Sequence, residues 1–218
     1  MKKTALSDTP QRQRRKEARP AELLEAALDL FVERGFAATK LDEVAARAGV
    51  AKGTLYLYFA SKEELFKAVI QQGVLPVVEE GEGMLVQHSG DAAALLRNLV
   101  YRWWELMGNT KLAAIPKLII SEAGNFPEVA RYFYENVAQR IDNLLAEVLK
   151  QGMDSGEFRR VDVASAVDAI TAPVLMRVIW QYSMQPYCCS GQKDSEIYIS
   201  THIDLLLNGL TLKEQEHE

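Results

Sequence analysis

The stretch TKLDEVAARAGVAKGTLYLYFASKEEL, residues 39–65, determines the architecture that we expect, because it contains the signals for two short helices, a tight turn and a third helix. Apolar residues follow Thr39 at the spacing of one helix face, and Asp42 stands three residues later as an acidic variant of the capping box. We therefore expect a helix to begin at Thr39. Gly49 can adopt the left-handed backbone conformation that ends a helix, so the turn begins there.

The second helix of this stretch is expected to run from Lys52 to Phe59, with Leu55 and Phe59 on its buried side. The remaining side chains then form an open face whose cation, hydroxyls and glycine backbone suit the base edges and phosphates of DNA. Ser61 and Glu64 form a second capping box, so the third helix begins there, and its first turn also favours a phosphate. The residues that we expect to contact DNA are Thr39, Lys40, Lys52, Gly53, Thr54, Tyr56, Leu57, Tyr58 and Lys62.

A helical hairpin in which TLYLYF, residues 54–59, is ordinary core is the alternative interpretation. The run GVAKGTLYLYFASKEELF, residues 49–66, behind a first helix that ends in RGF, residues 34–36, instead resembles the TetR family of transcriptional regulators. The resemblance is sharp over residues 21–70 and weak beyond them. Ala51 departs from the family pattern, in which Ser or a similar residue usually caps the recognition helix, and the missing acceptor costs about 1 kcal/mol.

The resemblance implies an all-α chain, in which an amino-terminal domain of three helices reads DNA and a divergent helical domain binds a ligand and dimerises. We expect a flexible basic arm at residues 1–19, a helix-turn-helix domain at residues 20–70 and a ligand-binding and dimerisation domain at residues 71–218. The first helix is expected from Ala21 to Phe36. The arm either contacts phosphates or the minor groove, or is a solvated tail.

Composition and charge are those of a globular protein with a basic end. A chain of 218 residues with 48% hydrophobic residues is long enough to bury a sizeable core. Residues 1–70 contain 13 Lys and Arg against 10 Asp and Glu, a net charge of +3. Since the whole chain has a net charge of −5, residues 71–218 carry a net charge of −8. This distribution favours DNA at the amino-terminal end. We find no apolar run long enough to span a membrane and no signal peptide, so we expect a cytoplasmic protein without a membrane partner.

The middle of the chain contains large, soft side chains suited to an apolar pocket for a small hydrophobic effector. Because neighbouring helical residues diverge by about 100°, we expect either Trp103 or Trp104 to point outward or to an interface. Residues 118–137, LIISEAGNFPEVARYFYENV, also resemble the ligand domain of the subset of the family tied to efflux and stress operons. The candidate effector residues, for each of which plain core is the alternative, are Trp103, Trp104, Met107, Phe126, Phe133, Met176 and Trp180.

Two final helices are expected, from Val163 to Met184 and from Asp194 to Leu210, each with an apolar stripe. In the TetR family such a terminal antiparallel pair is the dimer interface, and a helix-turn-helix protein gains affinity from two half-sites one turn of DNA apart. The alternative is that the stripes face the core of their own domain, as part of each must. The candidate interface residues are Val167, Val174, Leu175, Ile203, Leu206, Leu207 and Leu210.

Other chemistries have little support in the sequence. Cys188 and Cys189 are adjacent in an expected loop, where reduced bystanders, a thiol sensor and soft-metal capture are the alternatives. His88, His202 and His217 lack metal-ligand spacing, so we expect neither a metal nor a cofactor. An enzyme would need a nucleophile with a base, a paired acid and base or a glycine-rich phosphate loop, and we find none of these.

We therefore expect a sequence-specific, homodimeric DNA-binding regulator. It would be a repressor that a small hydrophobic effector releases from a double-stranded operator, with efflux or stress genes under its control. By the family resemblance, effector binding shifts the helix that begins at Ser61 and changes the separation of the two recognition helices. The alternatives are an architectural DNA-binding protein without an effector, for which the remaining chain of about 150 residues is too long, and a thiol-responsive regulator acting through Cys188 and Cys189.

Overall fold

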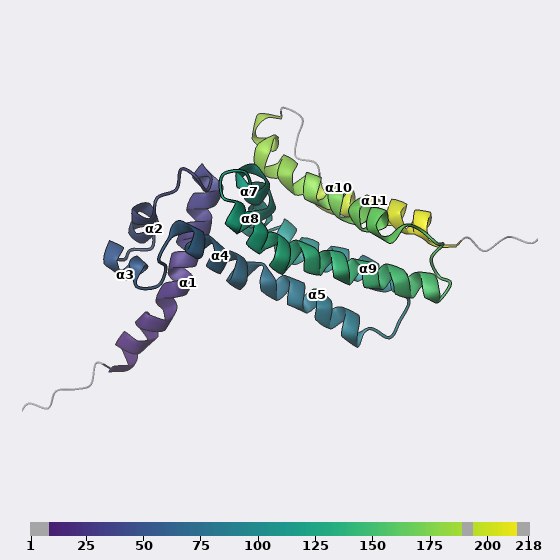
Figure 1. Cartoon of the computed structure of the whole chain (residues 1–218), viewed down its shortest axis with the longest axis horizontal. Helices are drawn as coiled ribbons and strands as arrows, with labels where there is room; N and C mark the ends of the chain where they lie inside the picture. The colour runs from purple at the N-terminus through teal and green to yellow at the C-terminus, as the bar shows by residue number, and fades with distance from the viewer. Residues whose placement is uncertain (1–8, 189–193, 213–218) are drawn as a thin grey trace, which may run out of the picture. The chain divides into compact units, whose positions relative to one another are not determined.

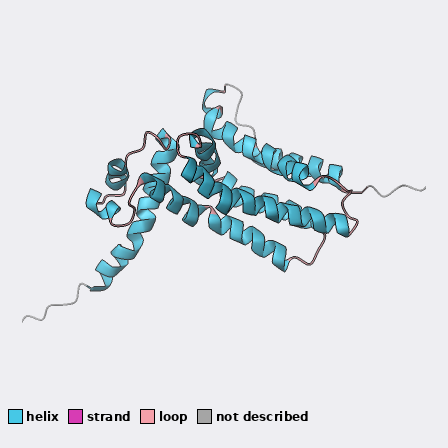
Figure 2. Ribbon diagram, viewed as in Figure 1, coloured by secondary structure: helices cyan, strands magenta, loops and turns pink. Residues whose placement is uncertain are grey.

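The computed structural model describes residues 9–188 and 194–212 of the chain, and the side chains from Pro20 onward. Within these residues the regular secondary structure is helical, with one isolated bridge between Phe158 and Thr211 (Figure 2). The predicted all-α fold is therefore confirmed. The chain divides into two compact units, Met1–Val69 and Ile70–Glu218.

The first unit contains α1 (Thr9–Arg34), α2 (Leu41–Arg47), α3 (Lys52–Tyr56) and most of α4 (Lys62–Gly73) (Figure 1). Helix α1 begins at Thr9 rather than at Ala21, so residues 9–19 of the expected arm are helical, while residues 1–8 lie outside the described part. Our prediction was wrong because apolar periodicity reports burial, and the run QRQRRKEAR, residues 11–19, consists of good helix formers without an apolar stripe.

Three phenylalanines form the centre of the first unit. The ring centroid of Phe31 lies 5.3 Å from that of Phe36 and 5.0 Å from that of Phe66, and Phe36 lies 5.1 Å from Phe66. All three side chains are buried, as is Leu55 of α3. Helices as short as α2 and α3 are not stable alone, so packing on this cluster is what keeps them folded.

The turn between α2 and α3 follows the predicted signal. Gly49 has a φ of +67°, and the Val50 N–H donates to the Ala45 carbonyl oxygen at 2.9 Å. Helix α3 ends at Tyr56, earlier than the expected Phe59, although the Phe59 N–H still donates to the Leu55 carbonyl at 3.0 Å. The recognition helix is therefore a little more than one turn long.

The second unit is a bundle in which α9 packs against α5, α6 and α10, and α11 packs against α10 and α6 (Figure 1). Its elements are α5 (Leu75–Gln87), α6 (Ala92–Trp103), the π-helical turn η1 (Trp104–Gly108), the 3₁₀ turn η2 (Lys111–Ala113), α7 (Ala114–Glu122), α8 (Pro127–Phe133), the π-helical turn η3 (Tyr134–Ala138), α9 (Gln139–Asp154), α10 (Val163–Ser183), the 3₁₀ turn η4 (Gln185–Tyr187) and α11 (Ser195–Leu210).

The connection from α9 to α10 folds back onto the bundle. Phe158 is buried so close to the backbone of α9 that a Cβ atom at Gly152 would overlap its ring. The Glu157 carboxylate accepts hydrogen bonds from the N–H groups of Ala92 at 2.6 Å and Ala93 at 2.8 Å. It thereby satisfies the first turn of α6, where the positive end of the helix favours an anion.

Helix α10 is apolar around most of its circumference. One window of 18 residues has a mean hydropathy of 1.5, so by length and composition α10 is apolar enough to cross a membrane. This corrects our expectation that no such run exists, but one helix of this kind is weak evidence for a membrane, since core helices pass the same test. Only 28% of the window is buried inside the protomer, which leaves apolar surface open to a partner.

Candidate DNA-binding face and effector cavity

Helix α3 is anchored by the fully buried Leu55 and turns its other side to solvent. The open positions, which are the predicted ones, are Lys52, Gly53, Tyr56, Leu57 and Tyr58, with Thr54 half-buried among them. Leu57 has 82% of its surface exposed. An exposed leucine between two exposed tyrosines contributes nothing to the packing of the first unit and is typical of a surface that meets a macromolecule.

Gly53 is not required by the packing of the first unit. A Cβ atom at this position would meet no atom within 4 Å. A glycine inside a helix costs about 1 kcal/mol relative to alanine, so close approach of a ligand to the backbone is the better explanation for it. Ala51, the N-cap of α3, provides no side-chain acceptor, as predicted.

Lys52 is held by a contact with α2. Its Nζ donates to Asp42 Oδ2 at 2.7 Å and lies 5.9 Å from the ring centroid of Tyr56. The hydrogen bond to Asp42 raises the pKa of Lys52, since the carboxylate favours the charged ammonium. Because both side chains are exposed, the pair contributes little to stability, and a phosphate can replace the carboxylate.

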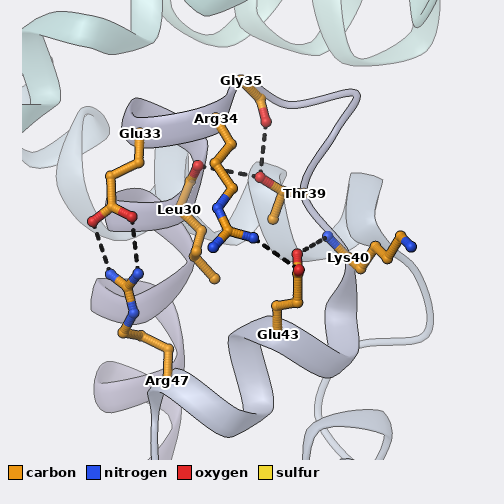
Figure 3. A network of polar contacts seen from close by, with 8 residues as sticks. All are labelled: Leu30, Glu33, Arg34, Gly35, Thr39, Lys40, Glu43 and Arg47. Atoms are coloured by element: carbon orange, nitrogen blue, oxygen red, sulfur yellow. Dashed lines mark hydrogen bonds and ion pairs between the residues drawn. The ribbon is translucent and has the colours of Figure 1, made fainter.

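Thr39 is buried, and its hydroxyl lies 2.8 Å from the Gly35 carbonyl oxygen and 3.2 Å from that of Leu30 (Figure 3). This corrects two predictions, because Thr39 neither caps α2 nor presents a hydroxyl to DNA. Lys40 is the N-cap, its N–H donates to Glu43 Oε2 at 3.3 Å, and its side chain is exposed. Lys40 therefore remains a candidate for DNA contact.

Two ion pairs join α1 to α2 behind this face (Figure 3). Arg34 Nη1 lies 2.8 Å from Glu43 Oε1, and the guanidinium of Arg47 donates to both carboxylate oxygens of Glu33 at 2.9 and 2.8 Å. The two-point contact fixes the orientation of α2 as well as its distance from α1. Sequence inspection missed these positioning residues because partners 9 and 14 positions apart leave no local signal.

Lys62 does not present its ammonium group as we predicted. Its Nζ donates to the carbonyl oxygens of Phe36 at 2.7 Å and Ala37 at 2.9 Å, and it lies 4.6 Å from the centroid of the Phe36 ring. These contacts tie the start of α4 to the segment after α1. The predicted cap is confirmed, since the Glu64 N–H donates to Ser61 Oγ at 3.1 Å.

The second unit contains an apolar cavity of about 420 Å³, a volume typical of sites for drug-sized ligands. Its walls come from α5, α6, α7, α8, η3, α9 and α10. The π-helical turn η3 forms part of the wall, and η1 directly follows the lining residue Trp103. Such turns are frequent at functional sites.

The structure places the effector candidates in several different environments. Trp103 and Phe133 line the cavity, as predicted. Trp104 and Met107 are buried in packed core, and Phe126 is the half-buried N-cap of α8, so none of these three lines the cavity. For Trp104 and Met107 the alternative of plain core is the correct one.

Met176 and Trp180 correct our prediction most clearly. They lie on the outer face of α10 with 57% and 46% of their surfaces exposed, and neither lines the cavity. The lining residues that α10 does contribute are Ile170, Thr171, Val174 and Leu175. Aromatic and sulfur-containing side chains suggested a ligand, but they do not reveal which side of a helix faces the cavity.

The predicted dimer residues mostly face their own unit. Val167, Ile203, Leu207 and Leu210 are buried in the core, Leu206 packs against it, and Val174 and Leu175 line the cavity. The alternative that these stripes face their own core is therefore correct. The apolar side chains that α10 and α11 leave open to solvent are instead Met176, Trp180, Ile197 and Leu205.

One cysteine and the candidate metal ligands can be placed among the described residues. Cys188 is exposed after η4, and Cys189 lies outside the described residues. Among the described residues, no group of three or more His, Cys, Asp and Glu side chains is placed to hold a metal ion. His202 Nε2 lies 3.1 Å from the Ile170 carbonyl oxygen, so this histidine links α11 to α10.

Two family models match the chain. The model described as bacterial regulatory proteins of the tetR family matches residues 23–69, and the model described as the carboxyl-terminal domain of tetracyclin repressor-like proteins matches residues 86–185. The HTH-type transcriptional repressor KstR2 of Mycobacterium tuberculosis is 30% identical over 198 residues, which cover 89% of this chain and 94% of that protein.

Two further similarities cover nearly the whole chain. The fatty acid metabolism regulator protein of Bacillus subtilis is 23% identical over 199 residues, which cover 89% of this chain and 98% of that protein. The crystal structure of the transcriptional regulator FadR from Bacillus subtilis in complex with stearoyl-CoA has a TM-score of 0.72 at 24% identity, over 87% of this chain and 98% of that chain. At that identity the structural similarity establishes the fold.

Proposed function

This chain belongs to the TetR family and is a DNA-binding transcriptional regulator, not an enzyme, and we propose that it is a repressor which a small hydrophobic effector releases from its operator. One observation carries the proposal: the exposed face of α3 and an apolar cavity occur in separate units of one chain. A ligand-responsive regulator needs both sites. An architectural DNA-binding protein has no use for the cavity.

We assign the operator contacts to the exposed face of α3 and its neighbours. Lys52 and the hydroxyl of Thr54 suit base edges, and the methyl groups of Leu57 suit the methyl group of thymine. The hydroxyl of Tyr56 suits a phosphate. The complete set is Lys40, Lys52, Gly53, Thr54, Tyr56, Leu57 and Tyr58.

The effector suited to the cavity is a mainly apolar molecule, since aliphatic and aromatic side chains make up nearly all of its lining. Of the effector candidates from the sequence we keep Trp103 and Phe133. The structure adds Val137 and Leu175, which also line the cavity. The similar FadR structure contains stearoyl-CoA, which supports a long apolar ligand in a helical domain of this kind.

We propose that the working form is a homodimer built through the open apolar side of α10 and α11. Members of the TetR family are dimers, and Met176, Trp180, Ile197 and Leu205 supply the exposed apolar surface that such an interface buries. A shallow groove on α11 lies between Ile197 and Leu205 and can receive a side chain of the second copy. Two copies place two recognition helices on half-sites about 34 Å apart.

Helix α4 is the continuous element through which effector binding can reach the DNA-binding face, because it begins at Lys62 in the first unit and ends at Gly73 in the second. We propose that effector binding shifts α4 and so changes the spacing of the recognition helices. A duplex with fixed half-site spacing then loses one of its two contacts.

The regulated genes are proposed to be those that metabolise or export the hydrophobic effector. The named relatives concern fatty acid metabolism and, for the KstR2 structure, ketosteroid regulation, and none of them supports the efflux or stress genes that we expected from the sequence. Because the operator is double-stranded DNA, we place the protein in the cytoplasm. The exposed Cys188 leaves a thiol response as the second candidate for the release signal.

A thermal-shift screen of hydrophobic compounds, followed by mobility shifts on the protein's own promoter region, tests the proposal. A compound that stabilises the protein should release it from the promoter, because binding to the folded protein raises its melting temperature. Release by an oxidant that is lost in Cys188→Ser would favour the thiol response instead. Stabilising compounds that never release the promoter would contradict the proposal.

A further inference from the structure

The cavity of the second unit has one charged group in its lining, and that group is a carboxylate. Asp142 of α9 is the only charged side chain among the residues that line the cavity. Among the other aliphatic side chains of the lining, Thr171 of α10 is the one with a polar group. Asp142 also remains exposed, so it stands where the cavity opens to solvent. Ile120 and Tyr134 are the other exposed residues of the lining and carry no charge, so a ligand with a polar outer end finds the one charged group of the cavity at Asp142.

A second carboxylate strengthens the negative charge at this opening. Asp168 lies on α10 one turn before the lining residue Thr171, and its negative charge acts on Asp142. Partial burial raises the pKa of Asp142, and the negative charge of Asp168 raises it further. The two carboxylates are thus close enough for each to disfavour further negative charge.

Two of the arginines next to the lining residues, Arg102 and Arg140, are paired with glutamates. Arg140 precedes the lining residue Ile141, and its guanidinium donates to both oxygens of Glu82 at 2.8 and 2.6 Å. Arg102 precedes Trp103, and its guanidinium pairs with Glu80 and with Glu105. Lysine and arginine are absent from the residues that line the cavity, so within the lining an anionic head group would meet one carboxylate, that of Asp142, and no cation.

We propose that the effector carries an uncharged hydrogen-bond donor or a positive charge at one end of an apolar body, and that Asp142 binds this end while the cavity holds the rest. An aliphatic amine is the simplest example of this chemistry and an aliphatic alcohol the next. Fatty acids and acyl-CoA thioesters, which place a carboxylate or phosphates at the opening, are disfavoured. The inference rests on the proposed function, since it specifies the chemistry of the effector.

The experiment uses dodecylamine, dodecanol and dodecanoate, which share one alkyl chain and differ in the head group, with lauroyl-CoA as a fourth probe. Binding to the full-length protein is followed by tryptophan fluorescence, to which Trp103 in the wall of the cavity contributes. We expect dodecylamine to bind at least about tenfold more tightly than dodecanoate, as for a hydrogen bond between charged groups, with dodecanol between them. Lauroyl-CoA should bind no better than dodecanoate.

The variant Asp142→Asn identifies the group responsible. It should bring dodecylamine and dodecanoate to within about twofold of each other and leave dodecanol nearly unchanged. The matched control is Asp154→Asn, which removes the same charge from the same helix at an exposed site paired with Arg160 at 3.1 Å and away from the cavity. This control should keep the preference of the wild type, and melting curves of both variants establish that they are folded.

The outcomes separate this inference from the proposed function. Dodecanoate or lauroyl-CoA binding as tightly as dodecylamine, or an unchanged preference in Asp142→Asn, would overturn the inference and leave a hydrophobic effector in place. The expected order of binding without release of promoter DNA would support the inference and contradict effector-driven release. Failure of all four probes to bind would contradict both the proposed head-group preference and the proposed hydrophobic effector.

Discussion

The two functional regions of this molecule are built in opposite ways. Apart from Lys40, the proposed DNA-binding face comes from one continuous stretch, residues 52–58, that a single buried residue, Leu55, holds in place. The proposed effector cavity is assembled from seven helical elements spread over residues 81–175. A face made of neighbours in sequence is visible as a motif, whereas a cavity made of distant segments becomes visible only after folding.

The largest expected effect tests whether the two regions fail separately. Phe66→Ala removes one ring of the aromatic cluster of the first unit and should destabilise that unit by about 3–5 kcal/mol. Operator binding should be lost, while binding of a hydrophobic compound should survive. All three tryptophans lie in the second unit, so their fluorescence contains no signal from the first unit. Simultaneous loss of both activities would show that the units do not fold independently.

The next effect concerns the open apolar side of α10. Trp180→Ala should weaken dimerisation by about 2 kcal/mol or more, as expected for an aromatic anchor at an interface, with little change in effector binding. Sedimentation over a range of concentrations measures the change. Val86→Ala is the matched control, because Val86 is an exposed apolar residue on α5, and it should leave the dimer intact. Equal behaviour of the two variants would place the interface elsewhere.

Two glycines separate a packing role from a binding role. Gly152→Ala forces a methyl group into the ring of Phe158 and should cost about 1–3 kcal/mol of stability. Gly53→Ala meets no atom within 4 Å and should leave stability unchanged or improve it by up to about 1 kcal/mol, while operator affinity falls. Chemical denaturation and operator titration of both variants provide the comparison. Normal operator binding by Gly53→Ala would contradict the proposal that DNA closely approaches the backbone at Gly53.

The smallest effect is a pH dependence of opposite sign at two carboxylates. The pKa of Asp142 is raised above 3.8, so its ionisation destabilises the folded state as the pH rises through that window. Asp142→Asn should therefore slightly raise the melting temperature at neutral pH, and the gain should vanish below pH 3.8. The hydrogen bond from Arg140 lowers the pKa of Glu82 below 4.5, so Glu82→Gln should lower the melting temperature at neutral pH. The same sign for both variants would contradict these environments.

The sequence predicted the first region well because its signals are local. Gly49 marks the turn, Ala51 lacks a cap acceptor, and Ser61 caps α4, all as expected. The errors at Thr39 and Lys62 share a cause. Each side chain bonds to backbone carbonyl oxygens, and the sequence does not show whether a polar residue at a helix start bonds to a carbonyl oxygen or to a phosphate.

The second region was predicted as a class of site rather than as a set of residues. Helix α10 is apolar on more than one side, so periodicity could not assign Leu175 to the cavity and Trp180 to the outer face. The position of Asp142 beside the cavity could not be predicted from the sequence, because a single acidic residue in an amphipathic helix is usually part of the solvent-exposed face. Only its position at the opening of the cavity gives it a role.

The most direct test of the account is the operator affinity of three forms of the protein with and without a saturating hydrophobic compound that stabilises it. Phe133 lines the cavity and Phe126 does not, and both are half-buried aromatic residues at opposite ends of α8. The account predicts that the compound weakens operator binding by at least about fivefold in the wild type and in Phe126→Ala, within the usual range of allosteric coupling. In Phe133→Ala a much higher concentration of the compound should be needed. An operator affinity that does not change while the compound is bound, or an equal loss of response in both variants, would contradict the account.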